Sequence, residues 1–433
     1  MNRRTFLGAL ALSPLARAAE LPPVNAARLR DHLERLSVFG RPAGGTFADG
    51  VSRIAYSDAD IAGRRYAMDL MANAGLEPRL DPAGNISARR SGSDPSLAPV
   101  LFGSHIDSVP NGGNFDGDVG SMAAIEVVQT LNENHVATRR PLEVAIWSNE
   151  EGVAFNNGIT GSRAAAGRLD PGELDAVWNG MVKRDAIHKI GGDPGRIAQA
   201  ARAKGSFHCY LELHIEQGGT LEREGFPIGV VEGIVAIDRY DAEIRGFANH
   251  AGTTPMPERR DALLAASYLT VAVNEIVRAQ PGRQVGTVGQ IAVTPNAPNV
   301  VPGRVLQTIE LRDLSADKIK ALAAQLRDRA ADIARKTGTE IELRQVAHHD
   351  PALATPAVQQ TIEAVCAKLG LRTMRLPSGA GHDAQAMATL GPMGMIFVPS
   401  VGGISHSPKE LTRWEDCANG ATVLMHTVLA LAG

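Results

Sequence analysis

Short apolar runs alternate with helical segments through the first half of the chain, and this alternation leaves few architectures open. The β-rich runs cover residues 100–102, 142–147 and 210–213, and a helix is expected over residues 119–132. Strands that alternate with helices predict an α/β sheet with helices on its faces. Ligands of such sheets gather at the carboxyl ends of the strands, so the polar residues that follow each run are candidates for function.

The pattern changes after residue 233. Tyr240, Ala242 and Ile244 alternate with charged residues, which predicts a strand in a sheet with one solvated face. The elements expected in this part are strand, helix, strand, strand, helix and strand, over residues 239–245, 260–278, 284–293, 304–312, 316–336 and 340–345. This order is the split βαβ, ferredoxin-like arrangement of small α+β domains.

The main fold resumes after this insertion. A helix, a strand and a final helix are expected over residues 356–369, 395–399 and 414–431. Residues 21–88, before the first strand, are predicted to be mostly helical with polar loops. We therefore expect a mixed-sheet α/β domain over residues 22–233 and 346–433, interrupted by an α+β domain over residues 234–345.

The N-terminus has the features of an export signal. Arg3-Arg4-Thr5-Phe6-Leu7 resembles a twin-arginine signal, an apolar run reaches Leu15, and Ala16-Arg17-Ala18 fits an A-x-A cleavage site. Residues 1–18 are therefore predicted to be removed, and the mature protein to be periplasmic or secreted. The alternative is an unprocessed amphipathic N-terminus. No other stretch is long and apolar enough to span a bilayer, so no membrane contact is expected after signal removal.

Charge and cysteine content argue against two kinds of site. A formal net charge of −3 leaves no basic excess to neutralise phosphates, so nucleic acid is not an expected partner. Cys209, Cys366 and Cys417 lie far apart without CxxC spacing, so we expect neither a disulfide framework nor thiolate metal ligation. If an anionic substrate binds, local cations must hold it.

Five polar segments carry a His or a carboxylate, most of them at a predicted strand end. They cover residues 103–108, 114–118, 149–152, 212–218 and 404–408. Imidazole and carboxylate groups without cysteine suit Zn²⁺, Mn²⁺, Co²⁺ or Ni²⁺. Each segment alone is more often a hydrogen-bonded or solvated group. Together they hold enough ligands for two ions that share a bridging carboxylate.

Seven motifs resemble one family of enzymes. The motifs GSHIDSVPNGGNFDGDVG, WSNEEGVAF, LELHIEQG, NHAGTTPM, NVVPG, SGAGHDA and GISHSP are similar to those of metal-dependent N-carbamoyl-L-amino acid hydrolases, allantoate amidohydrolases and β-ureidopropionases. These enzymes are relatives of the aminoacylase and carboxypeptidase metallohydrolases. The resemblance runs from about residue 25 to the C-terminus, and its motifs are too long and too numerous for a chance match.

The resemblance implies the ligands of a two-ion site. His105 would bind one ion and Asp116 would bridge the two. Glu151, His214 and His406 would each bind a single ion, and the cofactors would be two divalent ions per subunit.

The resemblance also implies two supporting acids. Asp107 would orient the His105 imidazole, and Glu150 would be the general base that accepts a proton from the attacking water. Neighbouring residues of an extended segment point in opposite directions. Glu150 and Glu151 can therefore both face the site only if a local turn brings them inward.

Substrate contacts follow from the same resemblance. Gln217 would hydrogen-bond the ureido group, Arg312 would hold the substrate carboxylate as a bidentate fork, and Asn299 would assist. His250 would stabilise the oxyanion. In relatives this histidine reaches into the partner's site, which implies a homodimer through the inserted domain acting as a lid. Backbone contacts would come from Gly379, Ala380 and Gly381.

Two positions are left open by these motifs. His382 could be catalytic or structural, and the sequence favours neither. Asp118 stands where relatives mostly have proline, and we expect its side chain to face solvent, although it could also add charge near the ions.

The expected activity is hydrolysis of the carbamoyl C–N bond of an N-carbamoyl-L-amino acid, with release of ammonia, CO₂ and the amino acid. Allantoate amidohydrolysis is the alternative, and a dipeptidase or amide-cleaving aminoacylase is a third reading that the Gln217 and His250 motifs disfavour. A catalytically dead periplasmic binding protein is the alternative from another class. The intact set of ligands and Glu150 argues against it.

Overall fold

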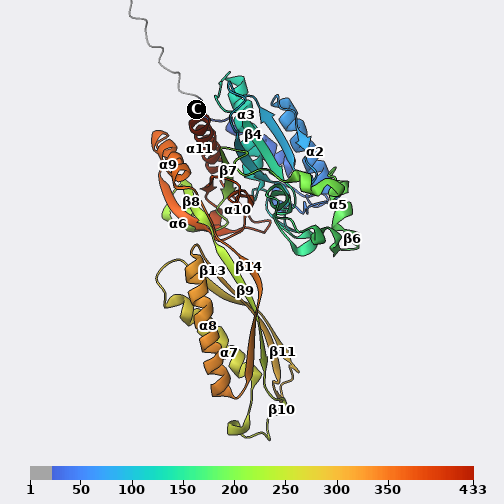
Figure 1. Cartoon of the computed structure of the whole chain (residues 1–433), viewed down its shortest axis with the longest axis vertical. Helices are drawn as coiled ribbons and strands as arrows, with labels where there is room; N and C mark the ends of the chain where they lie inside the picture. Colours follow the sequence, from blue (N-terminus) through green and yellow to red (C-terminus); the bar gives the residue numbers. More distant parts are fainter. Residues whose placement is uncertain (1–21) are drawn as a thin grey trace, which may run out of the picture.

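The computed structural model describes residues 22–433, which form two lobes along one long axis (Figure 1). The predicted signal over residues 1–18 lies outside the described residues. One lobe is built on a nine-stranded sheet and the other on a four-stranded sheet. Among residues 22–433, no helix is long and apolar enough to cross a membrane.

The large sheet is mixed, with the strand order β1-β2-β4-β3-β7-β17-β8-β15, and β16 pairs with β8 off this path. Its strands are β1 (Arg79–Leu80), β2 (Ile86–Arg90), β3 (Val100–His105), β4 (Leu142–Trp147), β7 (Cys209–Ile215), β8 (Ile228–Ile234), β15 (Ala352–Leu353), β16 (Thr373–Ser378) and β17 (Met393–Val398). The central strands β4, β3, β7 and β17 run parallel, so their carboxyl ends meet at one edge.

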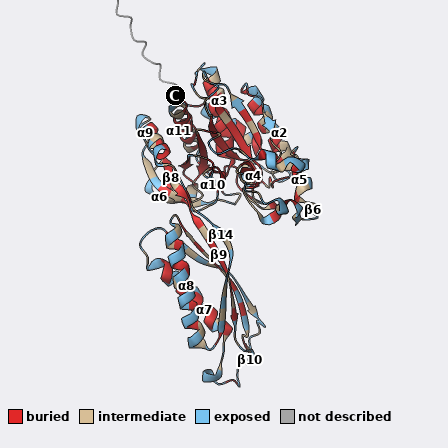
Figure 2. Ribbon diagram, in the orientation of Figure 1, coloured by how far each residue is buried: buried red, intermediate tan, exposed pale blue. Residues whose placement is uncertain are grey.

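Helices cover both faces of this sheet because successive side chains of each central strand point to opposite sides. Val100 and Phe102 of β3 pack in one cluster, while Leu101 packs in another on the opposite face. The first cluster is covered by α1 (Ala26–Leu36), α2 (Asp58–Asn73), α3 (Asp118–Glu133), α9 (Pro356–Lys368) and α11 (Trp414–Ala432). The second is covered by α4 (Thr160–Ala165), α6 (Thr220–Glu224) and α10 (Asp383–Met387). Figure 2 shows the buried strands between these helices.

The second lobe is the expected ferredoxin-like unit, with the strand order β11-β13-β9-β14 and every neighbouring pair antiparallel. Its elements in chain order are β9 (Ala236–Arg245), α7 (Ala262–Arg278), β11 (Val285–Thr294), β13 (Arg304–Asp313), α8 (Ala316–Thr337) and β14 (Glu340–His349). Both helices lie on one face, over a core that includes Tyr240, Ala242 and Ile244. The predicted alternation of β9 and the predicted fold class are confirmed.

Two smaller pairings complete the described structure. The strands β10 (Asn249–His250) and β12 (Val300–Val301) form a ribbon at the end of the second lobe farthest from the large sheet (Figure 1). The strands β5 (Val177–Trp178) and β6 (Met181–Val182) precede α5 (Lys183–Lys189) in the first lobe.

The prediction for residues 21–88 was wrong in part, because β1 and β2 lie in this region. Only Ile86 and Ala88 of β2 are buried apolar residues, and two polar or charged residues follow them. A strand with two apolar positions is too short to show period-two alternation.

Candidate dinuclear metal centre

The predicted ligands converge where parallel strands of the large sheet end. His105 is the last residue of β3, His214 is the next-to-last residue of β7, and Glu151 follows β4 by four residues. Asp116 lies in the loop before α3, and His406 lies in a loop after β17. The five side chains come from segments up to three hundred residues apart, and the sheet brings them together.

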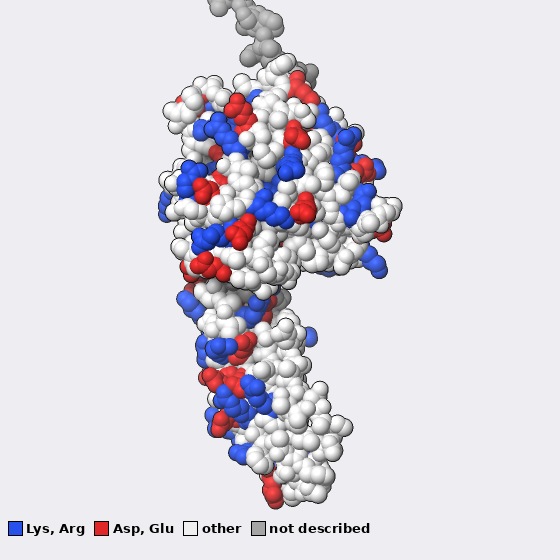
Figure 3. All heavy atoms as spheres, turned by 90° about the vertical axis from the view of Figure 1, so that its right-hand side faces the viewer, with Lys and Arg blue, Asp and Glu red and all other residues white. Residues whose placement is uncertain are grey.

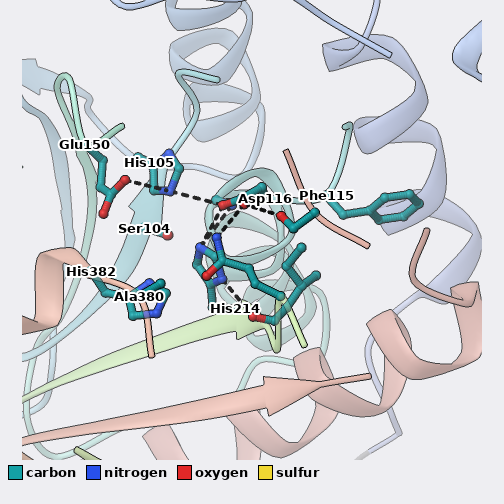
Figure 4. A network of polar contacts seen from close by, with 12 residues as sticks. Ser104, His105, Phe115, Asp116, Glu150, His214, Ala380 and His382 are labelled. Atoms are coloured by element: carbon teal, nitrogen blue, oxygen red, sulfur yellow. Dashed lines mark hydrogen bonds and ion pairs between the residues drawn. The ribbon is translucent and has the colours of Figure 1, made fainter. Parts of the chain in front are cut away.

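Three of these residues form a buried group that could hold one metal ion, namely His105, Asp116 and His214. The His214 Nε2 lies 3.1 Å from the Asp116 Oδ1, and the His105 Nε2 lies 3.7 Å from the same oxygen. Figure 4 shows both imidazole rings turned toward the Asp116 carboxylate.

A second metal-competent group contains Asp116, Glu151 and His406. The His406 Nε2 lies 3.4 Å from the Asp116 Oδ2 and 3.4 Å from the Glu151 Oε2. Asp116 therefore belongs to both of these groups and offers a different oxygen to each, whereas a third group, Glu212, His214 and His382, does not contain it. This sharing of Asp116 is the arrangement that a carboxylate bridging two ions requires.

Hydrogen bonds to the far side of two rings point the ligand nitrogens into the cluster. The His105 Nδ1 lies 3.0 Å from the carbonyl of Asp107, and the His214 Nδ1 lies 2.9 Å from the carbonyl of Ile215. With Nδ1 donating, each Nε2 keeps its lone pair for a metal ion. Burial lowers the pKa of His105 to about 4, which also favours the neutral, ligating form.

Two buried polar atoms without a hydrogen-bond partner indicate whether metal ions suit this group of residues. The His105 Nε2 and the Glu151 Oε1 are buried and have no hydrogen-bond partner. Leaving such atoms unpaired is costly unless a ligand satisfies them. Imidazole nitrogens and carboxylate oxygens are the donors that Zn²⁺ and its first-row neighbours accept. The residues present therefore fit two divalent cations.

A turn after β4 brings both neighbouring acids inward. Asn149 has a left-handed backbone with φ of 53°, and the Asp107 carboxylate accepts bonds from the Glu150 N–H at 3.1 Å and the Glu151 N–H at 3.2 Å. The Glu150 Oε2 then lies 3.6 Å from the His105 Nε2, while Glu151 faces His406. The condition that the sequence imposed on these two acids is met.

Asp107 contacts the His105 imidazole through its backbone carbonyl. The Asp107 carbonyl contacts the imidazole, whereas the carboxylate lies 3.9 Å from the ring nitrogen and holds the turn at residues 150–151 instead. Burial, together with the charges of Asp383 and Glu151, raises the pKa of Glu150 well above its ordinary value. A carboxyl group with a raised pKa can both accept and return a proton near neutral pH.

Glu410 is a functional residue that the sequence reasoning missed. Its Oε1 accepts bonds from the N–H groups of Phe115 at 3.0 Å and Asp116 at 3.1 Å, so it holds the loop that carries the bridging ligand. The hydroxyl of Ser405 lies within hydrogen-bonding distance of both Asp116 and Glu410. Glu410 follows a lysine in a polar run, and nothing in that run distinguishes it from a solvated acid.

The expectation that Asp118 faces solvent was wrong. Asp118 is 1% exposed and pairs with the guanidinium of Arg53, which is fully buried and also donates to the carbonyls of Leu36, Phe39 and Ile106. Asp118 is the first residue of α3, where the helix dipole stabilises a negative charge. Arg53 favours the ionised carboxylate, but burial outweighs it and raises the pKa of Asp118 to about 7. Arg53 thus connects the end of α1 to the residues that directly follow His105 and to the start of α3, which follows Asp116.

A cavity of about 1100 Å³ opens beside the metal-competent groups, between the two sheets. Glu150, Glu151, Gln217 and His406 line it from the large sheet, and Arg312 lines it from β13 of the second lobe. Ala380 and Gly381 also line it, and the Arg312 guanidinium donates to the carbonyl of Gly379. The Gln217 amide donates to the Asp116 Oδ2 at 2.7 Å.

Two predicted residues lie apart from this cavity. His250 is on β10 and Asn299 directly precedes β12, so both are exposed at the far end of the second lobe (Figure 1). The His250 Nδ1 accepts bonds from the N–H groups of Gly252 and Thr253, which fixes the ring at this tip. A single chain therefore does not bring His250 or Asn299 to the metal-competent groups.

Comparisons with known proteins agree on one relationship. A model of the peptidase family M20/M25/M40 matches residues 101–430. The N-carbamoyl-L-amino acid amidohydrolase of Geobacillus stearothermophilus is 42% identical over 406 residues, which is 94% of this chain and 98% of the relative. The allantoate amidohydrolase of Escherichia coli is 35% identical over 93% of this chain and 97% of the relative.

Solved structures give the same result. A hydantoinase/carbamoylase family amidase from Burkholderia multivorans matches with a TM-score of 0.86 and 37% identity. The match covers 95% of this chain and 98% of that structure.

Proposed function

Since this chain belongs to the peptidase family M20/M25/M40, as an amidohydrolase of non-peptide C–N bonds, we propose that it hydrolyses the carbamoyl C–N bond of N-carbamoyl-L-amino acids. The products would be ammonia, CO₂ and the free amino acid. The observation that carries the proposal is the cavity that Glu150, Glu151, His406 and Arg312 line together, beside the two metal-competent groups that share Asp116. The family resemblance drawn from the motifs is confirmed.

The names of the relatives favour an N-carbamoyl-L-amino acid over allantoate as the substrate. Three other relatives named N-carbamoyl-L-amino-acid amidohydrolase are 35% identical to this chain, and the relative at 42% identity has the same name. Relatives named for allantoate or ureidoglycolate are 35–36% identical. Allantoate is therefore the second substrate to test.

The roles of the ligand residues follow from their grouping. His105 and His214 would hold one divalent ion, Glu151 and His406 would hold the other, and Asp116 would contact both. Such ions supply Lewis-acid polarisation of the scissile carbonyl.

Glu150 would move the proton. Its side chain is 9% exposed, lines the cavity and belongs to neither of the two groups assigned to the ions, so it is free to accept a proton from the attacking water. The raised pKa lets the same group return that proton to the leaving nitrogen. Asp107 would keep Glu150 in place by accepting the N–H bonds of the turn.

Arg312 and Gln217 would orient the substrate. The Arg312 guanidinium lines the same cavity as Glu150, where a planar fork can bind the α-carboxylate with two parallel bonds. Its present partners are the Glu310 carboxylate at 2.7 Å and the Gly379 carbonyl. The Gln217 amide, now bonded to Asp116, would turn to the ureido group.

His250 and Asn299 would reach the site of a second copy in a homodimer. The strand β11 is an edge strand, contains no charged residue and exposes Val285 and Ile291. The helix α7 exposes Leu264, Tyr268 and Val271, which recur at helical spacing. Figure 3 shows a broad area of this lobe without lysine, arginine, aspartate or glutamate. Apolar edges of this kind support pairing with a second copy.

Ammonia release from the Mn²⁺- or Zn²⁺-loaded protein tests the function. N-carbamoyl-L-amino acids and allantoate are assayed side by side, each with an EDTA control. Turnover of the carbamoyl acids that EDTA abolishes is expected. Preferential turnover of allantoate would move the assignment to the alternative branch. Absence of turnover of both, with two ions verified per chain, would refute the proposal and favour the binding-protein alternative.

A further inference from the structure

His382 packs directly behind one of the predicted metal ligands. Its ring lies 4.4 Å from the His214 ring between centroids, in an edge-on arrangement, and 5.8 Å from the Phe397 ring, which in turn lies 6.4 Å from the His214 ring. The side chain is 1% exposed, and His382 is not among the residues that line the cavity. Figure 4 shows His382 beside His214. The ring therefore does not reach the substrate, and it confines the orientation of His214.

A single hydroxyl connects His382 to the cavity loop. The His382 Nε2 lies 2.7 Å from the Oγ of Ser378, the last residue of β16. The same oxygen accepts the Ala380 N–H at 3.2 Å and lies 3.0 Å from the Ala380 carbonyl. A hydroxyl has one proton, and when the Ala380 carbonyl accepts it, the Ser378 oxygen accepts the N–H of the His382 Nε2. All hydrogen-bonding positions of the Ser378 hydroxyl are then filled.

The loop held in this way is the one that contacts Arg312. Ala380 and Gly381 line the cavity, and the carbonyl of Gly379 accepts a bond from the Arg312 guanidinium. A continuous series of contacts therefore runs from the ligand His214 through His382 and Ser378 to Arg312. The two ends of this series are the metal-competent group and the predicted anchor of the substrate carboxylate.

We propose that His382 and Ser378 are positioning residues that set the distance between the metal centre and the carboxylate anchor. The His382 ring holds His214 on one side, and its N–H fixes Ser378 and the loop at residues 379–381 on the other. The loop carbonyl in turn fixes Arg312. The inference rests on the proposed function, because it takes Arg312 as the carboxylate anchor. It resolves the open role of His382 in favour of positioning.

Ser378→Ala separates the loop from His382 without altering a cavity residue. The measurement is calorimetric binding of N-carbamoyl-L-methionine to the metal-loaded Glu150→Gln protein, with and without Ser378→Ala. Loss of two to three hydrogen bonds of the loop is expected to raise Kd about tenfold or more. Metal content after dialysis is expected to stay unchanged. Ser37→Ala, which removes a buried hydroxyl bonded to the Glu34 carbonyl far from the site, is the matched control.

Ser378→Ala in an Arg312→Ala background tests whether the loop at residues 379–381 acts on substrate binding through Arg312. Since the loop acts through Arg312, Ser378→Ala should then raise Kd by less than about threefold. His382→Gln keeps an N–H donor toward Ser378 but removes the ring behind His214. It should leave Kd near that of the parent and weaken metal retention against a chelator.

The outcomes distinguish a failure of this inference from a failure of the proposed function. Failure of the Glu150→Gln parent to bind the probe refutes the proposed substrate class, and the inference falls with it. Binding by the parent that Ser378→Ala leaves unchanged, or an effect of equal size without Arg312, overturns the inference alone. Unchanged metal retention in His382→Gln overturns the part of it that concerns His214.

Discussion

Asp107→Asn is expected to loosen the turn that brings Glu150 and Glu151 to one site. The Asp107 carboxylate uses one oxygen for each of the two N–H groups. An asparagine keeps a single acceptor oxygen, and its amide nitrogen would face the other N–H as a second donor. One bond is lost, and a repulsive contact replaces it.

The size of the effect follows from the chemistry of the lost bond. A hydrogen bond to a charged, buried acceptor contributes about 1.5–3 kcal/mol. Asp107 is 3% exposed, so solvent cannot replace the bond. At about 1.4 kcal/mol per tenfold change, kcat/KM and the affinity for the metal ion that Glu151 binds should fall about 10- to 150-fold.

The assay measures kcat/KM for a carbamoyl acid and metal affinity by competition with a chelator, at about pH 8. Burial raises the pKa of Asp107 to about 6, so the wild-type carboxylate is ionised there. Asp60→Asn is the control, since Asp60 is also a buried acceptor, for the Tyr56 N–H, and belongs to no metal-competent group. Unchanged metal affinity and kcat/KM in Asp107→Asn, in a folded protein, would refute the reasoning.

Four further predictions can be tested separately. Glu150→Gln should lower kcat at least 100-fold while two ions and substrate still bind, and an active variant would contradict the assigned base. Arg312→Ala should raise KM greatly and lower kcat, whereas an unchanged kcat/KM would exclude it as the anchor. A hydrogen bond with Asp238 raises the pKa of His348 above 6.5, so the pair stabilises below that pH and the stabilisation is lost as the pH rises through the folded pKa. The wild type should therefore have a larger free energy of unfolding than His348→Gln at low pH, and this difference should shrink as the pH rises. A difference that does not change with pH would contradict the prediction. Leu264→Glu should convert a dimer to a monomer in ultracentrifugation, and a monomeric wild type would contradict the lid pairing.

The sequence predicted the central strands and the six main elements of the second lobe because their periodicity is strong, but it did not predict the ribbon of β10 and β12. It missed β8, which contains Gly229 and Gly233. A Cβ atom at Gly233 would come within 2.7 Å of the backbone oxygen of Ala352, so a side chain there would collide with the neighbouring strand β15. Glycine in a strand weakens both propensity and pattern, and the reason for it lies in a contact with a distant segment.

The five residues predicted as ligands could be named from the sequence because they stand in motifs that resemble the family, most of them at predicted strand ends. Their supports could not. Glu410 holds the Asp116 loop from 294 residues away, and Arg53 reaches Asp118 across 65 residues. No local signal marks such a partner, and Asp118 was accordingly predicted to be solvated. The placement of His250 far from the cavity likewise depends on the length of the second lobe.

The number of acids near a metal site is a poor guide to the number of ligands, and this site shows the physical reason. Asp107 and Glu410 are buried, yet their carboxylate oxygens accept hydrogen bonds from backbone N–H groups of the segments that carry predicted ligands. Burying a carboxylate costs free energy, which these paired N–H bonds offset. These bonds fix the backbone at Asp116 and Glu151. The carboxylates of these two residues must converge on His406 despite their mutual repulsion. Acids that bind the backbone thus hold in place the acids that can bind metal.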